Sequence, residues 1–352
     1  MEKEMSNKRK IYLYVFVLLF LMACQRNQSD YCIPLFSTEK VLTVKILNDS
    51  DITRFSERIV EYDQYLIVLE KDLLTRSSLH LFDKESGEKL ADFFYEGRGP
   101  GEVVSLRELW LEDNRLLLYD AMLKKIIQFN LDSLVRLGNN AITENRITPP
   151  PFTVRVFLSD TLLITLGLQH TSEHDISKDI RISLRSPNRY CTFNDYPVDK
   201  AEDKYIAYRD YPIISVSPDK TKMAVGTAYG AILELFDISE DIRLLSTHRY
   251  IQPDYIWEKG AYNGMNEKTV KCFRDAWSSN EQLYTTYEDI PAMQCLFKAP
   301  TNIAVFDWEG KALKRFRINE YGILNFCVNE SESVFYAVLI DKDGFYYLAE
   351  LG

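Results

Sequence analysis

Residues 213–249 read IISVSPDKTKMAVGTAYGAILELFDISEDIRLLSTHR, a succession of four short apolar runs separated by three turns. Runs of this length are too short for helices and suit β-strands. The connections contain the Pro, Gly, Asp and Ser that tight turns require. Four antiparallel strands in so short a segment predict one blade of a β-propeller, whose apolar faces are covered only when several blades pack around an axis. The four strands are expected at Ile213–Val216, Met223–Thr227, Ala231–Asp237 and Arg243–Arg249.

The same pattern of four apolar runs separated by turns recurs before and after residues 213–249. Each further set of four runs predicts another blade. The preceding sets are Phe55–Tyr62, Tyr65–Leu69, Ser78–Asp83 and Lys89–Tyr95; Ser105–Leu111, Arg115–Tyr119, Lys125–Leu131 and Ala141–Thr148; and Val154–Leu158, Thr161–Leu168, Asp179–Ser186 and Thr192–Tyr196. The following set is Val270–Trp277, Gln282–Tyr287, Thr301–Asp307 and Ala312–Arg317.

The C-terminus has only three such runs, Ile323–Val328, Val334–Ile340 and Gly344–Leu351. A three-stranded last blade would leave an open edge, which proteins usually close. The unassigned N-terminal run Val41–Leu47 is expected to supply the fourth strand. The sequence therefore predicts an all-β fold, a six-bladed β-propeller with four-stranded antiparallel blades over residues 41–352, whose last blade is closed by an N-terminal strand.

Three of the expected third strands end in Phe-Asp, at Phe82-Asp83, Phe236-Asp237 and Phe306-Asp307. The ring is expected to pack between neighbouring sheets. The Asp is expected to accept backbone hydrogen bonds in the turn that follows.

The N-terminus has the layout of an export signal, with Lys8-Arg9-Lys10 followed by the apolar run Ile11–Ala23. An uncleaved anchor is the alternative, but a helix needs about 20 apolar residues to span a bilayer. Leu21-Met22-Ala23-Cys24 resembles a bacterial lipobox. That resemblance implies a signal peptide over residues 1–23 and lipidation of Cys24, with residues 24–40 as a tether. Gln25 favours the outer membrane, and we expect the periplasmic face.

Charge and cysteine content exclude several classes of function. The net charge of −10 gives no electrostatic attraction for nucleic acid. Besides Cys24 the chain has five cysteines, too few and too scattered for a disulfide scaffold, and no C-x-x-C pair. Free, buried thiols are therefore expected at Cys32, Cys191, Cys272, Cys295 and Cys327.

Three short matches to chemical motifs fall in predicted connections between strands. His170–His174 matches H-x-x-E-H, which binds zinc only on a helix. Ser217–Lys220 matches S-x-x-K, but lies in a hairpin turn, and Asp341–Gly344 lacks the spacing of a calcium loop. We therefore predict no catalytic residue, no metal site and no cofactor.

The lipobox, the six four-stranded units and the segment Tyr95-Glu96-Gly97-Arg98-Gly99-Pro100-Gly101-Glu102 together resemble the TolB-like six-bladed propeller lipoproteins of Bacteroidetes. The resemblance covers nearly the whole chain. It implies the fold and the anchor, and it implies no established reaction. The analogy with TolB itself points to periplasmic protein binding.

The predicted connections are short on one face of the disc and long on the other, where Tyr250–Thr269 and Glu288–Pro300 lie. Long ordered loops are often functional. We therefore expect this face to bind a partner through Arg98, Glu102, Trp257 and Tyr262. Alternatively, Arg98 is merely solvated or pairs with Glu102.

Two classes of function remain open. The first is a non-catalytic scaffold that binds a protein, peptide or glycan. The second is a propeller hydrolase or lyase with a site built from scattered loop residues.

Overall fold

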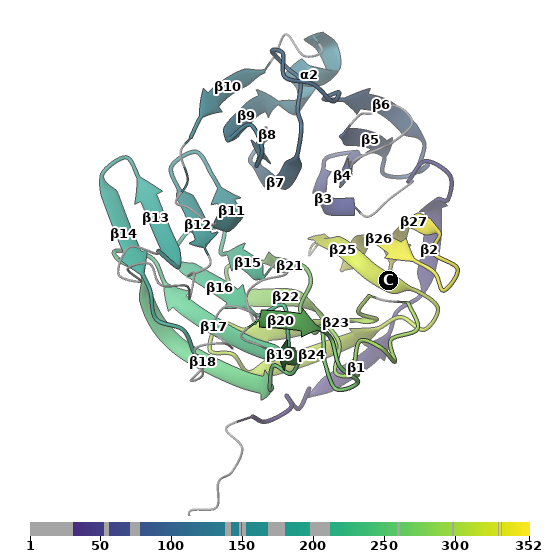
Figure 1. Ribbon diagram of the computed structural model, residues 1–352. Coiled ribbons are helices and arrows are strands. Elements are labelled where there is room, and N and C mark those ends of the chain that lie inside the picture. Colours follow the sequence, from purple (N-terminus) through teal and green to yellow (C-terminus); the bar gives the residue numbers. More distant parts are fainter. Residues whose placement is uncertain are drawn as a thin grey trace, which may run out of the picture.

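Six β-sheets are arranged as a ring around a central axis in this computed structural model (Figure 1). The structure describes residues 31–52, 56–70, 78–137, 142–147, 149, 153–167, 180–197, 212–258, 261–297, 299–329, 331 and 333–352. The six-bladed β-propeller predicted from the sequence is confirmed.

Each blade is an antiparallel sheet of four strands whose first strand lies innermost (Figure 1). The first three blades consist of β3 (Ser56–Tyr62), β4 (Tyr65–Glu70), β5 (Leu79–Asp83) and β6 (Lys89–Phe93); β7 (Leu106–Glu112), β8 (Arg115–Asp120), β9 (Lys125–Asn130) and β10 (Thr143–Arg146); and β11 (Thr153–Leu158), β12 (Leu163–Gly167), β13 (Ile182–Ser186) and β14 (Arg189–Phe193). The last three consist of β15 (Ile213–Val216), β16 (Lys222–Gly226), β17 (Ala231–Asp237) and β18 (Arg243–Ile251); β21 (Ala276–Ser278), β22 (Gln282–Tyr287), β23 (Asn302–Asp307) and β24 (Ala312–Arg317); and β25 (Gly322–Asn329), β26 (Val334–Ile340), β27 (Tyr346–Leu351) and β2 (Val44–Asn48).

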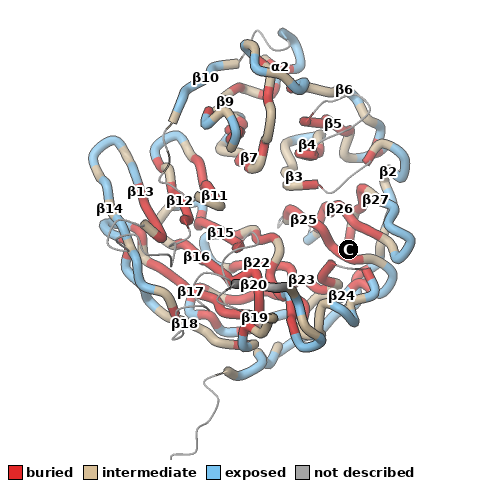
Figure 2. The backbone as a smooth tube through the Cα atoms, viewed as in Figure 1, coloured by how far each residue is buried: buried red, intermediate tan, exposed pale blue. Residues whose placement is uncertain are grey.

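Burial falls from the axis to the rim. The inner and middle strands are largely buried, whereas the outer strands expose much of their surface (Figure 2). The apolar side chains form clusters that fill the spaces between adjacent sheets, so each blade depends on its neighbours for its core.

The recurring Phe-Asp pairs play the predicted roles. Phe82, Phe236 and Phe306 are fully buried. Oδ1 of Asp237 accepts a hydrogen bond from the backbone N–H of Ser239 at 2.9 Å, and the equivalent oxygens of Asp83 and Asp307 accept backbone N–H groups in their own turns. One dipeptide thus fixes both the packing between sheets and the turn that follows.

The last blade is closed by the N-terminus, as predicted. Strand β2 pairs antiparallel with β27, with Val44 opposite Leu351. The backbone N–H of Thr43 donates to the carbonyl of Gly352 at 2.9 Å, and the reverse bond is 3.2 Å. The ring is therefore closed by hydrogen bonds between the two ends of the chain.

The N-terminal segment also contacts the fifth blade, which the sequence did not predict. Strand β1 (Thr38–Val41) adds in parallel to β24 as a fifth strand, and the ring of Phe36 packs against Tyr287 and Phe306. The run expected as one strand over residues 41–47 is interrupted at the buried Leu42, where the chain passes from one blade to the next. Contacts with the propeller thus begin within the segment expected to be a tether, residues 24–40.

Two expected strands differ from the structure. The first strand of the fifth blade is β21, which begins at Ala276 rather than at Val270, because residues 270–274 do not pair with β22. The outer strand of the third blade is β14 rather than residues 192–196, because a tight turn at residues 187–188 starts it earlier.

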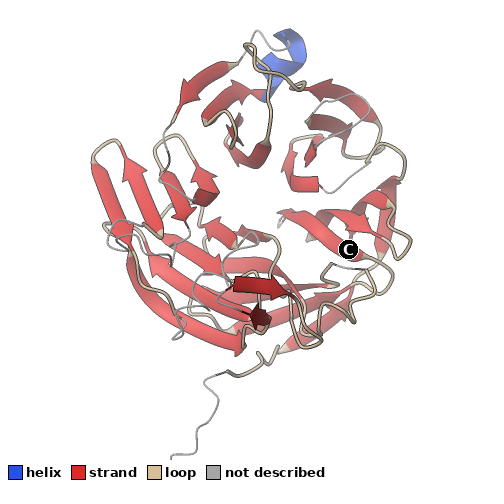
Figure 3. Cartoon of the chain, in the orientation of Figure 1, coloured by secondary structure: helices blue, strands red, loops and turns tan. Residues whose placement is uncertain are grey.

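A helix and a hairpin, like β1, were not predicted. The helix α2 (Leu131–Leu137) lies outside the ring between β9 and β10 (Figure 3). The side chain of Asn130 accepts the backbone N–H of Ser133 at 3.0 Å and caps this helix. Strands β19 (Ile256–Glu258) and β20 (Ala261–Gly264) form a separate hairpin in the crossing from β18 to β21.

None of the five cysteines in the described part of the chain forms a disulfide. Cys272 and Cys327 are buried, as expected. Cys191 and Cys295 are only half-buried, and Cys32 is exposed, so the expectation of buried thiols was wrong for Cys32.

Deletion of residues 25–48 tests the closure of the ring. It removes both β1 and β2 and exposes the edge of β27, so we expect aggregation or a melting temperature lower by roughly 10 °C or more. Deletion of residues 25–30 alone is the control and should leave the melting temperature unchanged. A soluble 49–352 chain that melts cooperatively at the temperature of the intact protein would contradict this closure.

Candidate functional site

Two cavities lie at opposite ends of the central axis. The larger, of 770 Å³, is lined by residues at the start of the inner strands and by the connections that follow β18 and β22. We call that end of the propeller the long-loop face. The smaller cavity, of 470 Å³, is lined by the later residues of the same inner strands and by turns such as residues 217–220. That end is the short-turn face.

The inner strands place one polar residue each around the axis, and we call this set the axial ring. Each member lies within the first four residues of its strand or directly before it, and each is more than nine-tenths buried. The members are Arg58 on β3, Glu108 on β7, Arg155 on β11, Ser215 on β15, Asp275 directly before β21, and Asn325 on β25. A buried polar group destabilises the folded protein unless it has a hydrogen-bond or ionic partner. The blades can therefore converge at the axis only if these side chains are paired.

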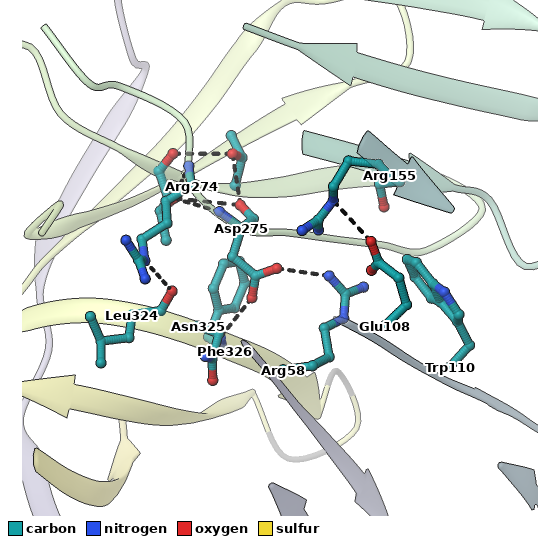
Figure 4. A network of polar contacts seen from close by, with 12 residues as sticks. Arg58, Glu108, Trp110, Arg155, Arg274, Asp275, Leu324, Asn325 and Phe326 are labelled. Atoms are coloured by element: carbon teal, nitrogen blue, oxygen red, sulfur yellow. Dashed lines mark hydrogen bonds and ion pairs between the residues drawn. The ribbon is translucent and has the colours of Figure 1, made fainter. Parts of the chain in front are cut away.

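Ion pairs join blades across the axial ring (Figure 4). Nη1 of Arg58 lies 2.8 Å from Oδ1 of Asp275, and Nε of Arg155 lies 3.2 Å from Oε1 of Glu108. The second oxygen of Asp275 accepts the backbone N–H of Phe326 at 3.0 Å. The three residues Arg58, Asp275 and Phe326 thus connect the first, fifth and sixth blades.

The axial ring separates the two cavities. Arg155 and Asp275 line the cavity on the long-loop face, whereas Arg58 lines the one on the short-turn face. The guanidinium of Arg58 also lies over the ring of Trp110, 4.2 Å from its centroid. The larger cavity therefore ends at a floor of ion-paired side chains.

Burial raises the pKa of Glu108, while the positive charges of Arg155 and Arg58 oppose this shift. Oε2 of Glu108 has no hydrogen-bond partner among the described residues. The charge on this carboxylate therefore depends on the nearby arginines.

The mouth of the larger cavity is apolar. Met265, Ile290 and Met293 line it with exposed fractions of 40%, 40% and 69%. Deeper in the cavity lie the buried Phe273 and Leu324. Large apolar side chains that gather around a cavity while exposed to solvent are typical of binding surfaces.

Two of the predicted contact residues belong to the loop before β7. Arg98 is exposed, whereas the carboxylate of Glu102 accepts the backbone N–H of Gly99 at 2.7 Å. A side chain at Gly97 would collide with this carboxylate, and Gly101 has a φ of +75°. Glu102 thus orders its own loop, and neither Arg98 nor Glu102 lines either cavity.

The other predicted contacts, Trp257 and Tyr262, are opposite one another in the β19–β20 hairpin. Their side chains lie outside what the structure describes, as do Cys24 and the His170–His174 segment. Residues 217–220 form the predicted turn, in which Ser217 Oγ donates to Asp219. Among the described residues, no group of three or more His, Cys, Asp or Glu could hold a metal ion.

Sequence reasoning missed the floor of the cavity. Arg155 and Arg274, which both line it, lie in or next to inner strands rather than in long loops. A signal was present in part, because Arg155 and Ser215 are polar residues within otherwise largely apolar strands. Met265 and Met293 do fall in the long loops predicted for this face.

Replacement of Arg155 by Met tests the ion-paired floor. It leaves Glu108 buried without its nearest cation, so we expect a loss of about 3–5 kcal/mol in the free energy of unfolding at pH 7. Because the folded state then favours protonated Glu108, stability should be greatest below the unfolded pKa of that carboxyl and fall as the pH rises above about 4.5. Unfolding by urea between pH 4 and pH 8 measures both effects.

Replacement of Lys45 by Met is the matched control, because Lys45 forms an exposed ion pair with Glu350. It should change stability by less than about 1 kcal/mol at every pH. A variant at Arg155 as stable as the Lys45 variant, or one without the added dependence on pH, would contradict the proposed electrostatics.

Comparisons with known proteins agree with this architecture. Residues 35–331 match the family described as TolB-like 6-blade propeller-like. A protein from Bacteroides fragilis NCTC 9343 described as exported has a similar structure, with a TM-score of 0.51 and 14% identity over 90% of this chain and 98% of that one. A member of the DUF4221 family from Bacteroides vulgatus ATCC 8482 has a TM-score of 0.54 and 10% identity over 89% of this chain and 97% of that one.

These structural likenesses show the fold alone. Comparison of the sequence with curated proteins gives no significant match. The family match, by contrast, spans most of the chain, from Leu35 before β1 to Ser331 after β25, and so covers five blades and part of the sixth. The chain therefore belongs to the TolB-like six-bladed propeller family.

Proposed function

We propose that this protein is an exported, membrane-anchored propeller that binds a protein, peptide or glycan on its long-loop face and catalyses no reaction. The observation that carries the proposal is the 770 Å³ cavity on that face, whose floor is closed by the axial ring. Ligand-binding cavities usually have volumes of about 300–1,000 Å³.

The surroundings of the cavity support a binding role. Its mouth belongs to connections rather than strands, and binding residues are often placed on such loops by a rigid scaffold. The exposed Met293 and Leu296 lie in the same connection, between β22 and β23. An apolar rim around a polar floor suits a partner that inserts one group into the cavity.

The predicted contacts fit this face to different degrees. Trp257 and Tyr262 belong to the same crossing as Met265 and Lys271, which line the cavity, so we propose them as contacts at its edge. Arg98 remains a candidate contact, farther out in the loop before β7. Glu102 contributes by ordering that loop.

The proposed anchor is the lipid on Cys24, in the outer membrane facing the periplasm. The backbone N–H of Cys32 already donates to the carbonyl of Arg249 on β18, at 2.8 Å. The seven residues between Cys24 and Cys32 span at most roughly 25 Å. In the described part of the chain, no helix is long and apolar enough to cross a membrane.

Binding to peptide and glycan arrays tests the proposed face. The Met293→Asp, Trp257→Ala and Tyr262→Ala variants should bind at least roughly tenfold more weakly than the unmodified chain, at an unchanged melting temperature. Met122→Asp is the matched control, because Met122 is 64% exposed and lies outside the cavity. Equal binding by all of these variants, with loss instead from Pro218→Glu on the short-turn face, would contradict the proposal.

Replacement of Cys24 by Ala tests the anchor. The variant should lose all labelling by palmitate and should no longer sediment with membranes. Its propeller should melt as before, because Cys24 precedes every described strand. Persistent labelling of the variant would show that the lipid is attached elsewhere.

A further inference from the structure

The N-terminal segment lies along the outer rim of the last three blades, and we call residues 32–48 the N-terminal belt (Figure 1). At its start, the backbone N–H of Cys32 donates to the carbonyl of Arg249 near the end of β18. The backbone N–H of Ser37 then donates to the carbonyl of Leu313 on β24, at 3.2 Å. Strands β1 and β2 follow the edges of β24 and β27. The belt is therefore fixed to the rim of the fourth, fifth and sixth blades.

The belt leaves several apolar side chains in contact with solvent. Phe36 packs inward, but its neighbour Leu35 is 89% exposed. Ile33 and Val41 are 56% and 55% exposed, and Ile46 on β2 is exposed as well. Apolar side chains that are exposed along one continuous segment are typical of a surface that contacts another protein or a membrane.

The charge on this part of the rim is opposite in sign to the net charge of the chain, which is −10. Four cations and one anion are exposed on β1, β2 and β24, namely Lys40, Lys45, Lys314, Arg317 and Glu39. Glu39 lies 3.9 Å from Arg317, and the half-buried Glu350 lies 3.1 Å from Lys45. Cations still outnumber anions when Glu350 is included. Such a surface is complementary to the anionic headgroups of a bilayer.

The proposed lipid on Cys24 would hold this surface close to the bilayer. The seven residues between Cys24 and Cys32 span at most roughly 25 Å. A surface tethered at so short a distance needs little affinity of its own, because the tether raises its effective concentration at the membrane. A lipid and a cationic surface commonly act together in stable membrane binding.

We propose that the N-terminal belt lies on the membrane surface. Ile33, Leu35 and Val41 then contact the headgroup region, and the cations of β1 and β24 contact anionic lipids. This inference rests on the lipid anchor proposed above. Because the belt follows the rim, the disc stands on its edge, and the cavity of the long-loop face stays open to the periplasm.

Lysine acetylation read by mass spectrometry tests this surface. The lipidated chain is added to vesicles of phosphatidylcholine and phosphatidylglycerol, and the Cys24→Ala chain without vesicles is the reference. Lys40 and Lys314 should react at least roughly threefold more slowly in the vesicle-bound chain. The exposed Lys124, on the second blade across the ring, and Lys268, in the crossing from β18 to β21, should react at an unchanged rate.

Three results would overturn the proposal. The first is equal reactivity of Lys40 and Lys314 in the two samples. The second is protection of Lys268 instead, which would place the long-loop face on the membrane. The third is protection of Lys40 and Lys314 in isolated cell membranes but not on vesicles, which would show that a protein covers the belt.

Two double variants with the same change of charge separate the belt from a general effect of acidity. Leu35→Asp with Lys40→Glu should abolish the protection of Lys314 in the lipidated chain, at an unchanged melting temperature, because both side chains are exposed. Met122→Asp with Lys124→Glu changes two exposed positions of the second blade and should leave Lys314 protected. Protection that persists in the first variant, or that is lost in the second, would contradict the proposed contact.

The anchor and the belt fail in distinguishable ways. If the parent chain takes up no palmitate, the anchor is wrong, and the proposal for the belt falls with it. If the parent chain is labelled but its Lys40 and Lys314 react as they do in solution, the anchor stands and the proposed membrane surface is wrong.

Discussion

The ion pairs of the axial ring are the constraint on which the rest of this propeller depends. Six inner strands converge on one axis, and each brings a buried polar side chain to it. Such groups are tolerated only when they pair with one another, and Arg58 with Asp275 and Arg155 with Glu108 do so between different blades. The axial ring therefore fixes the positions of the blades relative to one another. Its side chains also close the central axis between the two cavities.

This closure determines where a ligand can enter. Because the axial ring divides the axis, the long-loop face has a cavity with a floor rather than an open channel. At the rim, β1 and β2 hold the fifth and sixth blades together and bring the N-terminus to the outer edge, away from the axis. An anchor attached there would leave the cavity accessible.

The blades could be predicted from the sequence because short apolar runs and turn residues report directly on strands, as in residues 213–249. The strand that closes the last blade could be predicted because the C-terminus has only three apolar runs and one N-terminal run was left unassigned. Strand β1 could not be predicted, since Thr38–Val41 is exposed throughout and carries no apolar pattern. Arg98 and Glu102, two of the contact residues predicted for the long-loop face, are not among those that line its cavity. The partners of Arg155 and Arg274 come from other blades, and only the three-dimensional arrangement reveals them.

A double-mutant cycle on Arg58 and Asp275 tests the central claim most directly. The free energies of unfolding of Arg58→Met, Asp275→Leu and the double variant are compared with that of the parent chain. If this pair links the first and fifth blades, each single change destabilises strongly and the double variant is less harmful than their sum, with a coupling energy of about 2 kcal/mol or more. Additive effects, with a coupling energy near zero, would contradict the account.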